Sequence, residues 1–143
     1  MNKKDILLCF IASPDIKPVS PIQIMKGMFL IKKELNVTDF YEFEPYLYGP
    51  CSFEVYRDLQ QLVEENLVLS SPSIRGWKYY IISSKGMETF KAISQIMDKD
   101  LLEGIIRIKK IIIKKSFIEL LRYVYEKYPE YAVNSIINIE VLK

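Results

Sequence analysis

The stretch Phe40–Leu69, FYEFEPYLYGPCSFEVYRDLQQLVEENLVL, decides the fold of this chain. Residues 40–44 alternate large apolar and acidic side chains, which is the period-two pattern of a β-strand. Pro45 ends that strand or leaves it at a sheet edge, because proline cannot donate to a ladder. An amphipathic helix closed by Asn66 follows, and residues 67–69 begin another strand.

The corner Tyr48-Gly49-Pro50 separates the first strand from the helix. Glycine reaches positive φ and proline fixes its own φ, so the chain can turn sharply there. Ser52 is the expected N-cap of the helix, and Glu54 in the first turn complements the helix dipole. We therefore expect a strand, a tight corner and a helix in succession.

Apolar residues at helical or alternating spacing predict the elements on either side. Ser20 with Gln23, and Ser116 with Glu119, form capping boxes that mark two helix starts. The glycine and serine at 84–86 are expected to separate a hairpin from the helix after it. The predicted elements are helices over 3–13, 21–36, 87–97, 98–113 and 116–128, and a β-hairpin over 67–83.

This order predicts an α+β fold, a mostly helical winged helix-turn-helix with a β-hairpin wing and additional C-terminal helices. The chain has 143 residues, enough for one hydrophobic core. We expect residues 1–97 to form the winged-helix domain and residues 98–143 a helical extension packed on the same single domain. These C-terminal helices are also candidates for a homodimer contact.

Composition limits the chemistry of the chain. There is no histidine, the net charge is only +2, and no glycine-rich phosphate loop or metal-ligand spacing is present. We therefore predict no enzyme, no catalytic residue, no cofactor and no metal site. Cys9 and Cys51 fit free thiols in a reducing cytoplasm. Cys51 lies near a helix start and is either a reactive thiol or a small buried residue.

The N-terminal segment is interrupted by Asp5 and Pro14, and we interpret it as a buried helix instead of a signal peptide. Three cations break the isoleucine-rich run 105–113, so we do not expect a membrane span. No membrane partner is predicted.

The central stretch resembles a known family over about residues 24–90. The matching positions are Phe43, Pro45, Tyr46, Tyr48, Gly49, Pro50, Ser52, Tyr56, Asp58, Leu59 and Leu62. In these it is similar to the YwgA-like winged-helix family. More distantly it resembles the SocA-like (Panacea domain) antitoxins and phage-associated proteins, which share the Gly-Pro followed by a Val-Tyr helix. The resemblance implies a non-enzymatic protein, and the SocA-like members bind protein toxins.

The winged-helix pattern favours a DNA-binding protein that regulates transcription. Phosphate neutralisation dominates affinity for DNA, so we expect contacts from the wing and from clusters of lysine and arginine. A further cluster is Lys26, Lys32 and Lys33. The candidate nucleic-acid contacts are Arg57, Gln60, Gln61, Arg75, Lys78, Arg107, Lys109 and Lys110.

A second hypothesis is an antitoxin-like module that neutralises or recruits a toxin-like partner protein. Glu54 and Asp58 flank Arg57, which makes the third helix unusually acidic for DNA. Tyrosine and arginine are common interface anchors. The tyrosines that motivate this hypothesis are Tyr46, Tyr48, Tyr56 and Tyr79.

Overall fold

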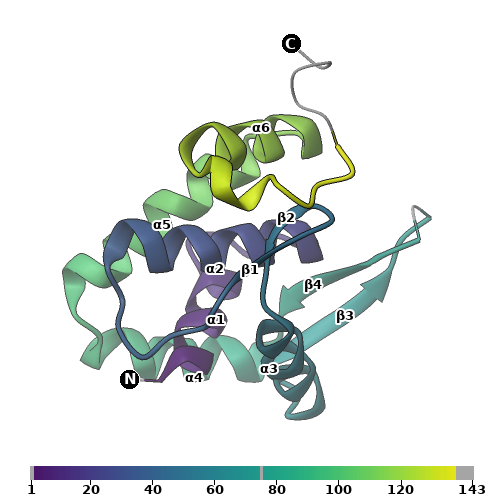
Figure 1. The fold of residues 1–143 in the computed structure, drawn as a ribbon. Helices are drawn as coiled ribbons and strands as arrows, with labels where there is room; N and C mark the ends of the chain where they lie inside the picture. Colours follow the sequence, from purple (N-terminus) through teal and green to yellow (C-terminus); the bar gives the residue numbers. More distant parts are fainter. Residues whose placement is uncertain (1, 75, 138–143) are drawn as a thin grey trace.

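The computed structural model describes residues 2–74 and 76–137 (Figure 1). Over these residues the chain is α+β, with six α-helices, one short 3₁₀ turn and two small antiparallel hairpins. The elements are α1 (Lys3–Ala12), α2 (Pro21–Leu35), β1 (Glu44–Tyr46), β2 (Gly49–Cys51), α3 (Phe53–Glu64), β3 (Val68–Pro72), β4 (Lys78–Ile82), α4 (Ser84–Ile96), α5 (Lys99–Ile113), α6 (Phe117–Lys127) and η1 (Pro129–Tyr131).

The predicted helix boundaries are confirmed where a cap defines them. Ser20 Oγ accepts from the Gln23 amide at 3.3 Å, and the Gln23 side chain accepts from the Ser20 amide at 2.9 Å. The same reciprocal pair joins Ser116 and Glu119 at the start of α6. Asn36, at φ 52°, ends α2 in the left-handed conformation.

The predicted strand over residues 40–44 is wrong. Ladder pairing begins only at Glu44, opposite Cys51, and continues to Tyr46 opposite Gly49. The successive residues Phe40 and Tyr41 are both buried, whereas a strand would send them to opposite faces. The burial of both rings therefore outweighs the strand preference that the alternating pattern of residues 40–44 indicates.

The start of α4 also differs from the prediction. The helix begins at Ser84 and includes Gly86, which the sequence pattern placed in a helix-breaking turn. Ser83 is the N-cap, and its hydroxyl accepts from the Gly86 amide at 2.9 Å. The cap supplies a partner for an amide at the helix start, which lets the helix begin before the apolar pattern does.

Helix α1 lies at the centre, with every residue from Ile6 to Ala12 buried. In Figure 1, α2 crosses the middle, α6 lies above it, and α3 and α4 lie below. Helices α5 and α6 contribute to the same core cluster as α1 and α2, through Ile105, Ile108 and Leu121 among others. The hairpin β3–β4 extends to the right, and paired backbone bonds between Val19 and Tyr80 attach it to the body.

The predicted corner forms the turn and the second strand of the β1–β2 hairpin. Gly49 has φ +95°, and a Cβ atom there would lie 2.7 Å from Cε1 of Tyr125 in α6. A side chain at this position would thus be strained and would collide with α6. Ser52 occupies the predicted N-cap position of α3, where its backbone amide donates to Met25 Sδ at 3.3 Å.

Two lysines are buried in the core. Lys26 is 2% exposed and donates to the Pro50 carbonyl oxygen at 3.1 Å. Lys109 is also 2% exposed and donates to the Ile11 carbonyl oxygen at 2.9 Å. A buried ammonium is costly unless it is hydrogen-bonded, and here each one joins a helix to a neighbouring backbone segment.

A pH-dependent stability test follows from Lys26. Burial lowers its pKa from 10.5 to about 8. Between these pH values the unfolded chain binds more protons at this position than the folded chain, so Lys26 increasingly favours folding as pH rises through this window. We expect the stability of Lys26→Met, relative to wild type, to fall by about 3 kcal/mol from pH 8 to 10.5.

Urea unfolding of both proteins across this pH window measures the difference. Lys91→Met, at an exposed position of α4, is the matched control and should show a constant difference from wild type. A constant difference for Lys26→Met as well would contradict the prediction.

Candidate binding surface

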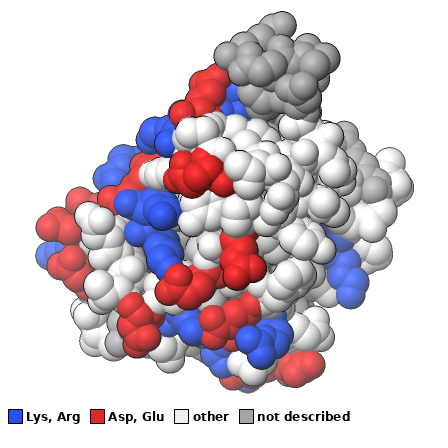
Figure 2. All heavy atoms as spheres, in the orientation of Figure 1, with Lys and Arg blue, Asp and Glu red and all other residues white. Residues whose placement is uncertain are grey.

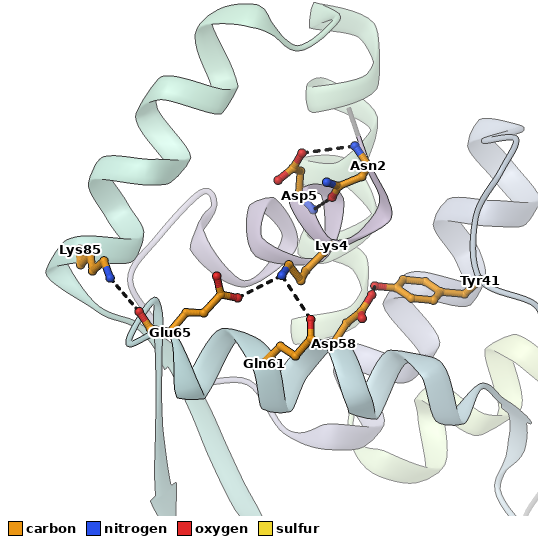
Figure 3. A network of polar contacts seen from close by, with 8 residues as sticks. All are labelled: Asn2, Lys4, Asp5, Tyr41, Asp58, Gln61, Glu65 and Lys85. Carbon is orange, nitrogen blue, oxygen red and sulfur yellow. Dashed lines mark hydrogen bonds and ion pairs between the residues drawn. The ribbon is translucent and has the colours of Figure 1, made fainter.

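Helix α3 turns part of its polar side towards the start of α1 (Figure 3). Lys4 Nζ lies 3.0 Å from Glu65 Oε1 and donates to Gln61 Oε1 at 3.3 Å. Lys85 Nζ donates to the Glu65 carbonyl oxygen at 3.0 Å. Gln61, a predicted nucleic-acid contact, thus already has an intramolecular partner.

The two carboxylates that flank Arg57 are also engaged within the chain. Glu54 Oε2 lies 2.5 Å from Lys3 Nζ. Asp58 Oδ2 accepts from the Tyr41 hydroxyl at 2.6 Å (Figure 3). Burial, reinforced by Asp58, raises the pKa of Tyr41 well above its usual range, so the phenol remains the donor. Lys3 and Lys4 of α1 therefore offset part of the acidity of α3, whereas the neutral Tyr41 phenol stabilises Asp58 without cancelling its charge.

The other predicted contacts on α3 and the hairpin are solvent-accessible where the structure describes them. Arg57 and Gln60 are exposed on α3, and Lys78 is exposed on β4. Arg75 lies outside the described residues. These side chains remain available to a partner.

The predicted basic cluster on α5 is only partly correct. Arg107 and Lys110 are exposed and border a shallow depression formed by α5 and its C-cap residue. The prediction that Lys109 contacts nucleic acid is wrong, because its ammonium is buried against Ile11. In Figure 1 most of α5 lies to the left of the view and the β3–β4 hairpin to the right.

The expected lysine cluster at 26, 32 and 33 is not a free basic surface either. Lys26 is buried. Lys32 lies 2.9 Å from Glu42 Oε2 and donates to the Tyr41 carbonyl oxygen at 2.7 Å.

Exposed aromatic side chains gather where the β1–β2 hairpin meets the starts of α3 and α6. Phe53 is 62% exposed, with ring centroids 5.6 Å from Tyr46 and 6.5 Å from Tyr56. The ring centroids of Tyr48 and Phe117 lie 5.7 Å apart. Phe117, at the start of α6, is 42% exposed. We call Tyr46, Tyr48, Phe53, Tyr56, Trp77 and Phe117 the aromatic face.

Figure 2 shows a broad area without charged side chains in the centre of the view, over the region of the β1–β2 hairpin in Figure 1. Lysine, arginine and acidic side chains instead follow the left and lower edges. Groups of exposed aromatic side chains mark interaction sites more often than scattered single residues do.

A cleft of about 730 Å³ opens between the start of α2, the β3–β4 hairpin and the start of α6. Sequence reasoning missed this cleft, because its walls come from several segments that are far apart in the sequence. Trp77 was assigned only as part of a hairpin, and the aromatic density of residues 77–80 was the available signal. The aromatic lining residues are Tyr48, Tyr56, Trp77, Tyr79 and Phe117, and Lys115 lies among them.

No protein-family model and no curated protein matches the sequence. The YwgA-like resemblance therefore stays a prediction.

Cys9 and Cys51 are free thiols, and burial raises the pKa of both, that of Cys9 to about 12.

The described residues contain no group of three or more His, Cys, Asp or Glu side chains able to hold a metal ion. None of their helices has the length and apolar character needed to cross a bilayer.

The Tyr41–Asp58 bond gives a direct stability test. Tyr41→Phe keeps the buried ring and removes only the donor, which leaves a half-buried carboxylate without its phenol. We expect a loss of about 1.5–3 kcal/mol, the range for hydrogen bonds to charged groups, measured by urea unfolding near neutral pH. Tyr79→Phe is the control, since no hydrogen bond of its hydroxyl is seen in the described chain. Equal losses of unfolding free energy in Tyr41→Phe and Tyr79→Phe would contradict a stabilising Tyr41–Asp58 hydrogen bond.

Proposed function

We propose that this chain is a protein-binding module that docks a partner through the aromatic face. The observation that supports it best is the contact between the exposed rings of Tyr46, Phe53 and Tyr56. Interface cores are rich in aromatic residues and poor in charged ones. A nucleic-acid surface would instead need many cations to neutralise phosphates.

The layout supports a winged-helix-like assignment for this module. Helices α1, α2 and α3 precede the β3–β4 hairpin, which takes the place of the wing. In this proposal the start of α3, the wing and the start of α6 each contribute rings to the aromatic face. An antitoxin-like role, in which the module neutralises or recruits a toxin-like protein, is the specific form that the resemblance suggests.

The test compares partner capture by two charge insertions. Phe53→Glu places a carboxylate at the centre of the aromatic face, and we expect it to reduce capture of a co-purifying protein at least about tenfold, as loss of an aromatic hot spot does. Ile96→Glu changes a side chain that is 80% exposed at the end of α4 and should leave capture unchanged.

Tagged wild type and both variants are compared by quantitative mass spectrometry of the bound fractions. Circular dichroism confirms that each variant is folded. A partner that binds wild type and Phe53→Glu equally would refute docking through this face.

DNA binding is the second candidate function, favoured by one observation. The carboxylates of Glu54 and Asp58 are engaged by Lys3 and Tyr41, so Arg57 is less hindered than the sequence suggests. In that case duplex DNA is contacted through α3 and the wing.

A mobility-shift titration at increasing salt separates the two candidates. DNA binding predicts a complex that weakens steeply with salt and is lost in Arg57→Ala with Lys78→Ala. Lys91→Ala, on α4, should leave it intact. The protein-binding proposal predicts no such complex at physiological salt.

A further inference from the structure

We propose that the cleft between α2, the β3–β4 hairpin and α6 binds a segment of the partner protein in which an aromatic or large aliphatic residue stands beside an acidic one. Lys115 receives the carboxylate, and the aromatic walls receive the apolar side chain. This inference rests on the proposed protein-binding function and specifies the chemistry that the partner must present.

The size and walls of the cleft suit side chains. Its volume of about 730 Å³ lies within the range of sites that bury ligands. Tyr56 and Trp77 come from α3 and the hairpin, whereas Tyr48 and Phe117 come from the β1–β2 turn and α6. Rings on both sides offer a large apolar contact area with little side-chain entropy to lose.

The electrostatics of the cleft favour a negative charge. Lys115 is the one charged residue among the described residues that line it. Helices α2 and α6 both begin at the cleft, and their N-termini add partial positive charge. An ammonium ligand, which aromatic rings would otherwise attract, is therefore disfavoured here.

Lys115 is available for pairing with a partner. Its ammonium lies 4.9 Å from the ring centroid of Tyr123, and none of the ion pairs of the described chain includes it. The nearby Glu119 carboxylate accepts from the Ser116 backbone amide at 2.8 Å within the capping box. The Ser116 hydrogen bonds, and after them the charge of Lys115, lower the pKa of Glu119, so a carboxylate supplied by the partner would share the Lys115 ammonium with Glu119.

Tyrosine hydroxyls in the walls add donors for the same carboxylate, whereas Ser20, Gln23 and Ser116 already use their side chains in capping boxes. The hydroxyls of Tyr48, Tyr56 and Tyr79 take part in no hydrogen bond that the described residues show. A single cation with neutral donors matches one carboxylate, whereas a nucleic acid would bring several phosphates.

Selection from random peptides displayed on phage, with the purified full chain as bait, tests this inference. We expect enrichment of peptides that place Phe, Tyr, Trp or Leu next to Asp or Glu. Trp77 is the only tryptophan of the chain and lines the cleft, so its fluorescence reports binding of a synthetic tryptophan-free enriched peptide.

Matched variants identify the carboxylate contact. Lys115→Gln should weaken the acidic peptide about tenfold, as expected for a lost charge-assisted hydrogen bond, but should not weaken its Asp→Asn or Glu→Gln counterpart. Lys115→Arg should retain binding, because it keeps the charge. Lys110→Gln removes the same charge on exposed α5 and should have no effect.

The inference fails if selection yields no enriched peptide, if enriched peptides lack acidic residues, or if Lys115→Gln and Lys110→Gln behave alike. Salt-sensitive quenching of Trp77 by oligothymidylate, without any peptide response, would also overturn it. The proposed function fails separately, when Phe53→Glu leaves partner capture unchanged. Capture lost in Phe53→Glu but intact in Lys115→Gln would keep the function and reject this assignment of the cleft.

Discussion

The hydrogen bond from the Lys26 ammonium to the Pro50 carbonyl oxygen is the contact on which the placement of the aromatic face depends. It joins the middle of α2 to the second strand of the β1–β2 hairpin at 3.1 Å, inside the core. A buried charge is tolerated only with a partner, so the bond constrains the hairpin to one position. That position sets the turn that carries Tyr48 and the start of α3 that carries Phe53.

Charge and apolar surface are separated by the way α3 packs on α1. The cations at the start of α1 and the phenol of Tyr41 face the carboxylates Glu54 and Asp58. The inner stripe of α3, with Val55, Leu59 and Leu62, is buried at the same time. The rings of Phe53 and Tyr56 are left on the solvent side of α3, next to the hairpin. This arrangement is the basis on which we propose a protein partner in preference to a polyanion.

Much of the local structure could be predicted from the sequence, because it depends on residues that are close together in the chain. The capping boxes at Ser20 and Ser116 depend on residues within one turn of the chain, and both form where they were expected. The order of helices and the β3–β4 hairpin followed from periodicity. The alternation at 40–44 misled because it resembles a strand, although Phe40 and Tyr41 both pack inward.

The aromatic and Gly-Pro-containing stretch 40–69 by itself determined a corner followed by an amphipathic helix, and it pointed to tyrosines as interface residues. Only the tertiary structure decided which lysines were surface residues, since Lys26 and Lys109 bond to carbonyl oxygens of distant segments. It also decided that Phe117 and Trp77 line one cleft with Lys115. Local sequence patterns determine helix and strand propensity and the helix caps. Which side chains are buried, and which ones meet in a cleft, depends on contacts between segments far apart in the sequence, and the periodicity of one segment carries no information about those contacts.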